Sequence, residues 1–324
     1  MSPRPFRFAI QSSSATSATE WRDRARQAED LGYSSLLVAD HYVGPGTIAK
    51  TRGVSPQVLA PWVAMATAAA STTTLRVGSR VLCIDYHHPA VLAKEAASLD
   101  LLSDGRLELG LGAGWTIGEY EAMGLTMDPA PTRIARLEEV IRLVKAHFGG
   151  DEIDVRGEHV HVFGYQGTPA PVQKPHPPLM IGGGSPKVLR LAGREADIVS
   201  FNFNNRAGVI GAEGVGSSTA ENMDDKVSWV REGAGDRFDQ IELEIGAYFT
   251  AVTDDADGAA GGLAKMFGLS VEEIKDHPNA YYGTVDQICD TLEARRARYG
   301  FSYVTVSDRN MEMFAPVVAR LAGR

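Results

Sequence analysis

The order of secondary-structure signals constrains this chain most. Strand-like apolar runs alternate with amphipathic helical segments along nearly all of its 324 residues, an order typical of βα units around a parallel sheet. The apolar runs predict eight strands, at residues 6–10, 34–39, 75–84, 107–112, 179–182, 197–201, 241–252 and 303–306. Eight such units favour an α/β fold, a (β/α)8 TIM barrel, and an open doubly wound sheet is the alternative.

The helical segments between the strands carry apolar residues at intervals of three and four. Residues 19–31 and 132–148 show this spacing, and Gly32 ends the first of them. Residues 56–70 are apolar enough to be covered by a second copy of the chain, or to clasp the barrel. No linker divides the sequence, so residues 1–324 are predicted to form a single domain.

Two stretches interrupt the alternation. Residues 149–178 predict two short strands around Gly157 and then a Pro-rich extended segment, and we interpret them as an insertion. Residues 202–237 begin polar and Gly-rich and become helical near 221–231. Barrel enzymes build their sites on the loops that follow strands, so this second stretch is typical of a binding lid.

The composition narrows the class of partner. The chain has 44% hydrophobic and 23% charged residues and a net charge of −9, without the basic surplus of a nucleic-acid binder. No run approaches the roughly 18 apolar residues of a membrane span, and the N-terminus lacks the apolar core of a signal peptide. Only two cysteines, Cys83 and Cys289, are present, which suits a reducing compartment. We expect a cytoplasmic protein that binds a small molecule.

A glycine run connects the fifth predicted strand to a helix. Gly182, Gly183 and Gly184 follow the apolar run, Ser185 suits a helix N-cap, and Pro186 suits the first helical position. Glycine permits positive φ and close approach of a ligand, and a helix start offers unpaired N–H groups and partial positive charge. This pattern predicts an anion site, most simply for a phosphate. A tight turn closed by a cap is the alternative.

Polar residues follow several strands at the barrel end where sites form. Asp40 and His41 follow the second strand, and an imidazole can take or give a proton at cellular pH. His41 is therefore the candidate catalytic residue, with a structural hydrogen bond as the alternative. His87 and His88 precede Pro89, which should begin the next helix, so His88 is interpreted as a neighbour of that helix start and neither histidine is placed in the site.

Two further motifs do not indicate the metal site or the dinucleotide site that their patterns first suggest. His159 and His161 form an H-x-H pair inside the insertion, far in sequence from any carboxylate cluster, so we predict no metal site. The run GLGAGW at 110–115 places Trp115 where a dinucleotide fingerprint needs its third glycine. Its small residues leave space for a flat ring, and Trp115 offers an apolar wall beside that space.

Taken together, these strand ends resemble a known superfamily. The run GSRVLCIDYHHPAVLAKEAASLDLLSDGRLELGLGAGWTIGEYEAMGL, with LGYSSLLVADHY before it and KPHPPLMIGGGSPKVLRLAGREADIV after it, is similar to the bacterial luciferase-like flavin and deazaflavin oxidoreductases. The similarity runs from about residue 6 to 201 and returns at YYGTVDQICDTLEARRARYGFSYVTV. It is greatest to the enzymes assigned to coenzyme F420. The resemblance implies a hydride transfer between a deazaflavin and an organic substrate in a homodimeric enzyme.

The resemblance also implies site residues. It places the cofactor ring beside Asp40 and His41, over a floor of Gly112, Ala113 and Gly114, with its phosphate on Gly182, Gly183, Gly184 and Ser185. A bulge at Ser79, Arg80, Val81 and Leu82, followed by Cys83, would lie behind the ring and carry a non-proline cis peptide. Residues 202–280 would vary with the substrate, so Asn202 and Phe203 are expected to contact it together with Trp115.

One departure from the superfamily bears on the substrate. Its sugar-phosphate dehydrogenases carry a glutamate acid at the position that aligns with Trp115, and this chain has no carboxylate there. The resemblance therefore implies a hydrophobic or planar substrate. An FMN-dependent monooxygenase and a non-catalytic flavin-binding protein remain alternatives, and a metal-dependent barrel hydrolase would need His and Asp ligands at several strand ends.

Overall fold

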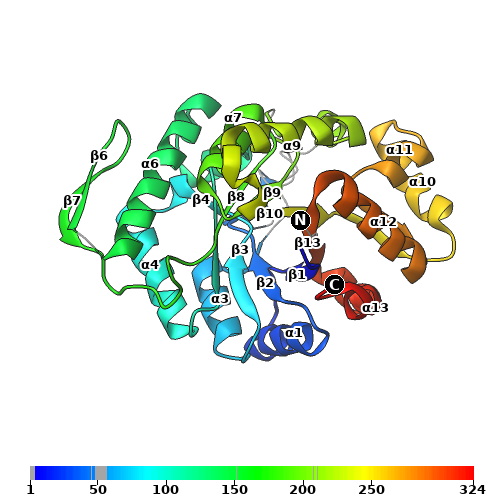
Figure 1. Ribbon diagram of the computed structural model, residues 1–324, viewed down its shortest axis with the longest axis horizontal. Helices are drawn as coiled ribbons and strands as arrows, with labels where there is room; N and C mark the ends of the chain where they lie inside the picture. Colours follow the sequence, from blue (N-terminus) through cyan, green and yellow to red (C-terminus); the bar gives the residue numbers. More distant parts are fainter. Residues whose placement is uncertain (1–3, 45, 48–56, 151, 207, 210) are drawn as a thin grey trace.

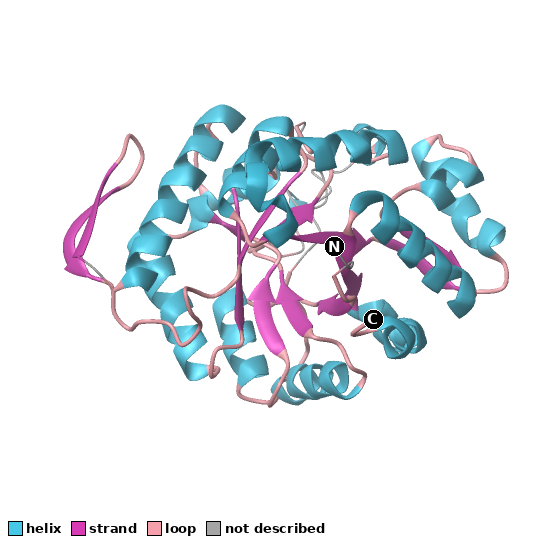
Figure 2. Ribbon diagram, viewed as in Figure 1, coloured by secondary structure: helices cyan, strands magenta, loops and turns pink. Residues whose placement is uncertain are grey.

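A closed barrel of parallel strands organises the protein. The structure is a computed structural model that describes residues 4–44, 46–47, 57–150, 152–206, 208–209 and 211–324. Figure 2 shows the strands at the centre with helices around them. The barrel strands are β1 (Arg7–Gln11), β2 (Ser35–Val38), β3 (Arg76–Ser79), β4 (Leu82–Cys83), β5 (Leu107–Gly112), β8 (Leu179–Gly183), β9 (Ile198–Phe201), β10 (Glu242–Ala247) and β13 (Phe301–Ser307).

The order of strand pairing closes the barrel. The strands follow the order β3-β2-β1-β13-β10-β9-β8-β5-β4, and β3 also pairs with β5. Val77 lies opposite Leu107, and this contact joins the two ends of the sheet. Because β3 and β4 together fill one position, the barrel has the eight predicted positions. The TIM-barrel prediction is confirmed, and the open doubly wound alternative is wrong.

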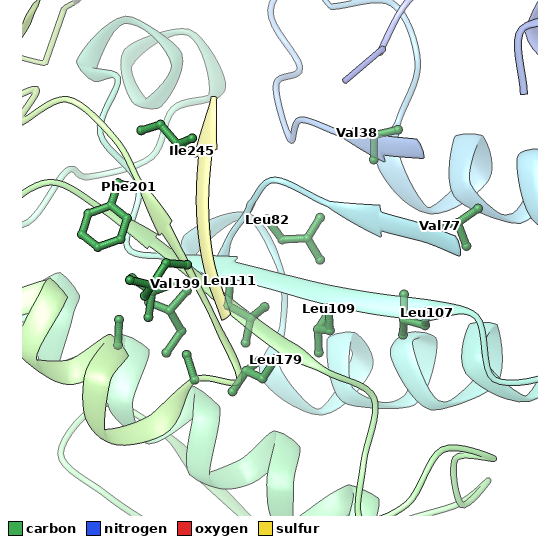
Figure 3. Close-up of a cluster of buried hydrophobic side chains, with 14 of the residues drawn as sticks. Val38, Val77, Leu82, Leu107, Leu109, Leu111, Leu179, Val199, Phe201 and Ile245 are labelled. Atoms are coloured by element: carbon green, nitrogen blue, oxygen red, sulfur yellow. The ribbon is translucent and has the colours of Figure 1, made fainter. Parts of the chain in front are cut away.

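Amphipathic helices cover the outside of the barrel, as Figure 1 shows. They bury their apolar faces against the strands because each strand has an outward row of aliphatic side chains. Figure 3 shows part of this core, where Leu107, Leu109 and Leu111 of β5 lie near Leu179 and Val199. The main helices are α1 (Ala18–Asp30), α3 (Pro61–Ala69), α4 (Pro89–Leu102), α6 (Ala130–Gly149), α7 (Pro186–Glu195), α9 (Ala220–Ala234), α12 (Val285–Tyr299) and α13 (Met311–Leu321).

Two predicted strands are interrupted, and one predicted helix is shorter. The run 75–84 divides between β3 and β4 at a cis peptide bond that joins Arg80 to Val81. The run 241–252 divides at Tyr248. The barrel strand β10 ends at Ala247, and β11 (Phe249–Val252) lies outside the barrel, where it pairs with the unpredicted strand β12 (Ala280–Gly283). In both runs apolar residues continue on each side of the interruption, so their patterns do not reveal the change of partner. The helix predicted at 56–70 is observed from Pro61 to Ala69. Residue 56, the first of the predicted range, lies outside the described residues.

Segments inserted between the barrel units form additional local elements. Strands β6 (Glu152–Arg156) and β7 (His161–Gln166) form an antiparallel hairpin that projects beside α6 in Figure 1, which confirms the two short strands predicted around Gly157. Glu139 of α6 accepts hydrogen bonds from three backbone amides of the hairpin turn. Helices α8 (Ala212–Gly216), α10 (Ala256–Phe267) and α11 (Val271–Asp276) belong to the stretch 202–280, and α5 (Ile117–Met123) follows β5. Among the described residues, we find no helix with the length and apolar character needed to cross a membrane.

Charged side chains fill much of the barrel interior. Near the strand starts, Arg7 and Arg76 both contact Glu108, whose second oxygen accepts from Tyr303 at 2.9 Å. Burial acts to raise the pKa of Glu108, but the two guanidinium groups outweigh it and the pKa is lowered. Nearer the strand ends, Arg80 pairs with Glu244 of β10. This polar column supports the floor of the cavity described next.

Candidate active site

A cavity of about 710 Å³ opens at the carboxyl ends of the barrel strands. Barrel enzymes place their sites at this end. Apart from Ser79, every residue predicted for the site lines it: Asp40, His41, Arg80, Val81, Leu82, Cys83, Gly112, Ala113, Gly114, Trp115, Gly182, Gly183, Gly184, Ser185, Asn202 and Phe203. Ser79 is buried, and its hydroxyl donates to the Gly110 carbonyl at 2.9 Å and accepts from the Gly110 amide at 3.0 Å. Ser79 therefore joins β3 to β5 and does not reach the cavity.

His41 is held by a carboxylate behind it. Its Nδ1 donates to Oε2 of Glu119, at the start of α5, across 2.7 Å. The other Glu119 oxygen accepts from the backbone amides of Tyr42 and Val43 at 2.5 and 3.2 Å. Burial acts to raise the pKa of Glu119, but these hydrogen bonds outweigh it and lower the pKa. A carboxylate only accepts, so Nδ1 carries the proton and Nε2 of His41 is left for chemistry in the cavity.

Asp40 forms a second carboxylate–histidine pair. In this pair the carboxylate lines the cavity, whereas in the first pair the imidazole does. Its Oδ2 accepts from the Cys83 amide at 2.9 Å and from Nε2 of His87 at 2.8 Å. Its Oδ1 is buried without a hydrogen-bond partner among the described residues. Here the carboxylate lines the cavity and the imidazole stands behind it. His87 was not among the predicted site residues, although it contacts one of them directly.

The floor of the cavity is made by backbone that packs closely. A Cβ placed on Gly112 would lie 2.6 Å from Cγ2 of Val81, the residue that follows the cis peptide bond. Gly114 adopts a φ of 74°, and a Cβ there would lie 2.2 Å from the Tyr120 hydroxyl. The cis peptide that the resemblance implied is present in the structure. The floor can therefore be flat, because no side chain projects from either glycine.

The glycine run packs closely for a reason that differs from the predicted one. Strand β8 extends to Gly183, and none of the three glycines adopts a positive φ. A Cβ on Gly183 would instead lie 2.3 Å from Val188, and one on Gly184 would lie 2.4 Å from the Asn202 carbonyl oxygen. Ser185 occupies the N-cap of α7 as predicted, but its side chain makes no capping hydrogen bond. The first amides of α7 are thus left for a ligand.

Arginines make one side of the cavity positive. Arg133 of α6 lines it with its guanidinium directed at backbone carbonyls, those of Ala113 at 3.0 Å, Asp128 at 2.8 Å and Gly114 at 3.4 Å. Arg206 also lines it and is exposed. Within the described ranges, neither arginine forms an ion pair with a carboxylate. An anion bound near them would gain Coulomb attraction that no protein carboxylate already satisfies.

Aromatic side chains enclose the remainder of the cavity. The Trp115 ring meets the His41 ring edge to face at a centroid distance of 6.0 Å. The centroid of the Phe203 ring lies 5.3 Å from that of Tyr248 and 6.3 Å from that of Phe249. All three side chains line the cavity. Such walls favour flat or apolar molecules over strongly hydrated ones.

The comparisons with known proteins give this fold a family. The model of the family described as "Luciferase-like monooxygenase" matches residues 4–266. The chain belongs to the luciferase-like monooxygenase family. The F420-dependent glucose-6-phosphate dehydrogenase of Kineococcus radiotolerans is 33% identical to it over 54% of this chain and 50% of that protein. The chain thus spans about half the length of the curated relatives it matches.

Two solved structures show the same luciferase-like barrel. The coenzyme F420-dependent tetrahydromethanopterin reductase of Methanopyrus kandleri superposes with a TM-score of 0.75 at 17% identity, over 98% of this chain and 99% of that one. An F420-dependent secondary alcohol dehydrogenase, in complex with an F420–acetone adduct, superposes with a TM-score of 0.76 at 18% identity over the same shares. At these identities the two structures establish the fold alone.

Sequence reasoning about this luciferase-like chain missed several side chains at the site. Glu119 was not predicted because the glutamate acid of the sugar-phosphate dehydrogenases aligns with Trp115, four residues earlier, and because Glu119 stands behind His41 outside the lining of the cavity. Arg133 belongs to the segment 132–148, whose apolar spacing predicted a helix but did not indicate an arginine that is only 8% exposed. Gln11, Tyr86, Tyr248 and Phe249 also line the cavity, and only their positions at or shortly after the end of a barrel strand could have indicated them.

The H-x-H pair lies away from the cavity. His159 and His161 belong to the hairpin, and Nε2 of His161 donates to the Gly157 carbonyl at 2.5 Å. In the part of the chain that the structure describes, no three His, Cys, Asp or Glu side chains are grouped for a metal ion.

Proposed function

We propose that this protein is an F420-dependent oxidoreductase that transfers a hydride between the deazaflavin and a small organic substrate. The observation that carries the proposal is the polarity of the cavity at the strand ends. One side is a flat glycine floor at Gly112–Gly114 beside His41. The other side has the first amides of α7 together with Arg133 and Arg206, which form no ion pair with a carboxylate among the described residues. The names of the curated relatives support the choice of coenzyme.

The cavity fits a coenzyme with a flat ring and an anionic tail. Ser185, the amides that begin α7 and Arg133 would hold the phosphate, and the closely packed glycines 182–184 would let it approach the backbone. Val81 and the floor at Gly112 and Gly114 would lie against the ring. When bound, the deazaflavin supplies the hydride chemistry. The protein's contribution is orientation and exclusion of water.

His41 would move the proton that accompanies the hydride. Its Nδ1 is fixed by Glu119, so Nε2 can accept a proton from a substrate hydroxyl or return one to a carbonyl oxygen. The negative charge of Glu119 stabilises the imidazolium that forms. In the opposite direction of turnover the same group donates.

Trp115 bears on the substrate class. An indole beside His41 leaves an apolar surface where a sugar phosphate would need hydrogen-bond partners, so we propose a hydrophobic or planar substrate. The relatives named for glucose-6-phosphate make a sugar phosphate the competing candidate. Trp115→Ala would raise KM for a planar substrate by about tenfold, the scale of a lost aromatic contact. Turnover of glucose 6-phosphate by the unaltered enzyme would overturn this substrate class.

Coenzyme titrations test the proposal directly. We expect the purified protein to bind F420 at micromolar or lower concentration, measured by difference absorbance, and to bind FMN at least about tenfold more weakly. Tight binding of FMN with oxygen consumption would instead favour the monooxygenase alternative, to which the family's description gives its name. Binding of a flavin without any redox turnover would favour the non-catalytic alternative.

The role of His41 has its own test. His41→Ala should lower kcat by about 10²–10⁴-fold, the usual contribution of a positioned acid–base group, and remove one limb of the pH profile. Coenzyme affinity should change little, because His41 contributes a proton carrier and not the phosphate site. Unchanged turnover across pH would exclude His41 from proton transfer.

We also propose that the enzyme is a homodimer in the cytoplasm. Val58 precedes α3 and Val63 lies in it, and their side chains are 65% and 69% exposed. Val91, Leu101 and Leu102 of α4 are exposed as well. These apolar side chains support cover by a second copy of the chain. Cys83 and Cys289 are free, which supports a reducing compartment. Light scattering of Val63→Glu and Leu102→Glu variants tests the dimer. Cell fractionation tests the location.

A further inference from the structure

The two histidine–carboxylate pairs at the site face in opposite directions. In the first, His41 lines the cavity and Glu119 stands behind it, and in the second, Asp40 lines the cavity and His87 stands behind it. We propose that His87 relays protons between solvent and Asp40 through a second cavity, separate from the mouth that admits substrate. This inference rests on the proposed redox function, since it concerns a proton exchanged with solvent during turnover in addition to the one that His41 carries.

The second cavity lies on the far side of His87. It has a volume of about 320 Å³ and lies between the 3-10 turn η1 (Ile84–Tyr86), α5, α6 and the turn of the hairpin. Asp85, Asp128 and Arg136 line it, with Nη1 of Arg136 at 2.6 Å from Asp85 and the same guanidinium bonded to Asp128. Polar groups and this volume allow several water molecules to be held there. Of the two described cavities, only the larger is lined by Asp40 and only the smaller by His87.

The Asp40–His87 hydrogen bond therefore crosses the wall between the cavities. Asp40 and the His87 side chain are nearly buried, the side chains being 0% and 9% exposed. When Oδ1 of Asp40 gives a proton to the reacting group, Nε2 of His87 passes its proton to Oδ2 across 2.8 Å while Nδ1 takes one from water in the second cavity. The imidazole is neutral before and after, with its proton moved from Nε2 to Nδ1, and no electron moves. Rotation of the Asp40 carboxyl group and exchange of the imidazole proton with water restore the starting state. For turnover in the opposite direction every transfer reverses.

Glu119 offers no comparable route for the first pair. Its side chain is fully buried and lines neither cavity. Its oxygens already accept from His41, from two backbone amides and, at 3.3 Å, from the Tyr86 hydroxyl. Burial raises the pKa of Tyr86, so this phenol holds its proton firmly. Glu119 thus fixes His41, whereas His87 lines a second cavity.

The charges around His87 come from several elements. Asp40 from the end of β2 is in direct contact, and Glu95 of α4 is close enough for the imidazole to act on its pKa, which burial raises. The groups that share the second cavity with His87 are Asp85, Tyr120, Asp128, Arg136 and His159.

Two substitutions of His87 separate a relay from a merely structural hydrogen bond. His87→Gln keeps an amide donor for Asp40 but carries no protons, and His87→Ala leaves space for a free imidazole. We expect both to lower kcat by about tenfold or more and to raise the solvent deuterium isotope effect, with coenzyme affinity within about twofold of the unaltered protein. Added imidazole should restore turnover of His87→Ala with saturation. A structural role predicts instead that His87→Gln keeps full turnover, and that result would overturn the relay.

The neighbouring His88 supplies the control. Its exposed side chain lines neither cavity, so His88→Ala should keep the kcat and the isotope effect of the unaltered protein and show no response to imidazole. Thermal unfolding and circular dichroism establish that each variant is folded before its kinetics are compared. The same kinetics are measured with whichever coenzyme the protein reduces.

A measurement without coenzyme separates this inference from the proposed function. In protein labelled with ¹⁵N-histidine, the Nε2 proton of His87 should exchange with water faster than the Nδ1 proton of His41, which Glu119 holds. Free imidazole should bind coenzyme-free His87→Ala and not His88→Ala. Slower exchange at His87, or absence of imidazole binding, overturns the relay. Absence of redox turnover in a protein that passes both tests counts against the proposed function alone.

Discussion

Nε of Arg80 lies 2.9 Å from Oε1 of Glu244 inside the barrel, and both side chains are almost completely buried. This ion pair joins the interruption between β3 and β4 to β10 on the other side of the barrel. Arg80 also lines the cavity and contacts Gln11 at 3.1 Å and Tyr248 at 3.0 Å. Burial acts to lower the pKa of Arg80, but Glu244 and Tyr248 outweigh it, so the guanidinium stays charged.

The Arg80–Glu244 pair should show strong coupling. Arg80→Met leaves a buried carboxylate without its partner and should lower the free energy of unfolding by about 3–5 kcal/mol. The double variant Arg80→Met, Glu244→Met removes both charges and should recover most of that loss. Urea unfolding of the two single variants and the double variant gives the coupling energy. Simple additivity of the single effects would contradict this account.

Glu119 should contribute to both turnover and acid stability. Glu119→Gln keeps an acceptor for His41 but removes the charge that stabilises its imidazolium, so kcat should fall by about ten- to hundredfold. The pKa of Glu119 is lowered in the folded protein, so its stabilisation is present above the unfolded value of about 4.3 and is lost as pH falls through the folded pKa. The difference in stability between the unaltered protein and Glu119→Gln should therefore shrink below about pH 4.3, measured by thermal unfolding. A difference independent of pH would contradict this.

Lys226 of α9 should make stability rise with pH. Its Nζ donates to the Asn202 carbonyl at 2.7 Å and to the Ser218 hydroxyl at 2.5 Å, and burial lowers its pKa to about 7. Between that value and the unfolded value of about 10.4 the unfolded chain binds more protons, so the free energy of unfolding increases with pH in this window. Lys226→Met should remove this increase, measured by urea unfolding at pH 7 and pH 10. An unchanged slope would show that Lys226 is not its source.

The glycine run should tolerate no added methyl group. Gly184→Ala places a Cβ 2.4 Å from the Asn202 carbonyl oxygen and 2.5 Å from that of Phe203. Because backbone must move, we expect a loss of about 1–3 kcal/mol of stability and a fall in coenzyme affinity, measured by unfolding and by titration. Gly261→Ala in α10 is the matched control, since a Cβ there meets nothing within 4 Å. It should leave affinity unchanged and increase stability by up to about 1 kcal/mol.

Local sequence determined the barrel units of this protein. The alternation of apolar strands and amphipathic helices, the Gly32 helix end and the Ser185 N-cap depend on interactions within a few residues, so periodicity and turn chemistry predicted them. The strand ends at Asp40, Gly112 and Gly182 follow from the same units. Parallel strands of a closed barrel bring all those ends to one rim, which is why the residues predicted at the strand ends line the same cavity.

Only the tertiary structure decided which side chains stand behind that rim. Glu119 reaches His41 from 78 positions away and His87 reaches Asp40 from 47, and no local pattern encodes either distance. The change of partner at Tyr248 has the same origin, because an apolar strand fits any sheet edge and packing selects one. The sequence by itself therefore determined the barrel and its rim, through short-range chemistry. The pairing of charges beneath the rim was decided by the folded chain, where burial makes each unpaired group costly.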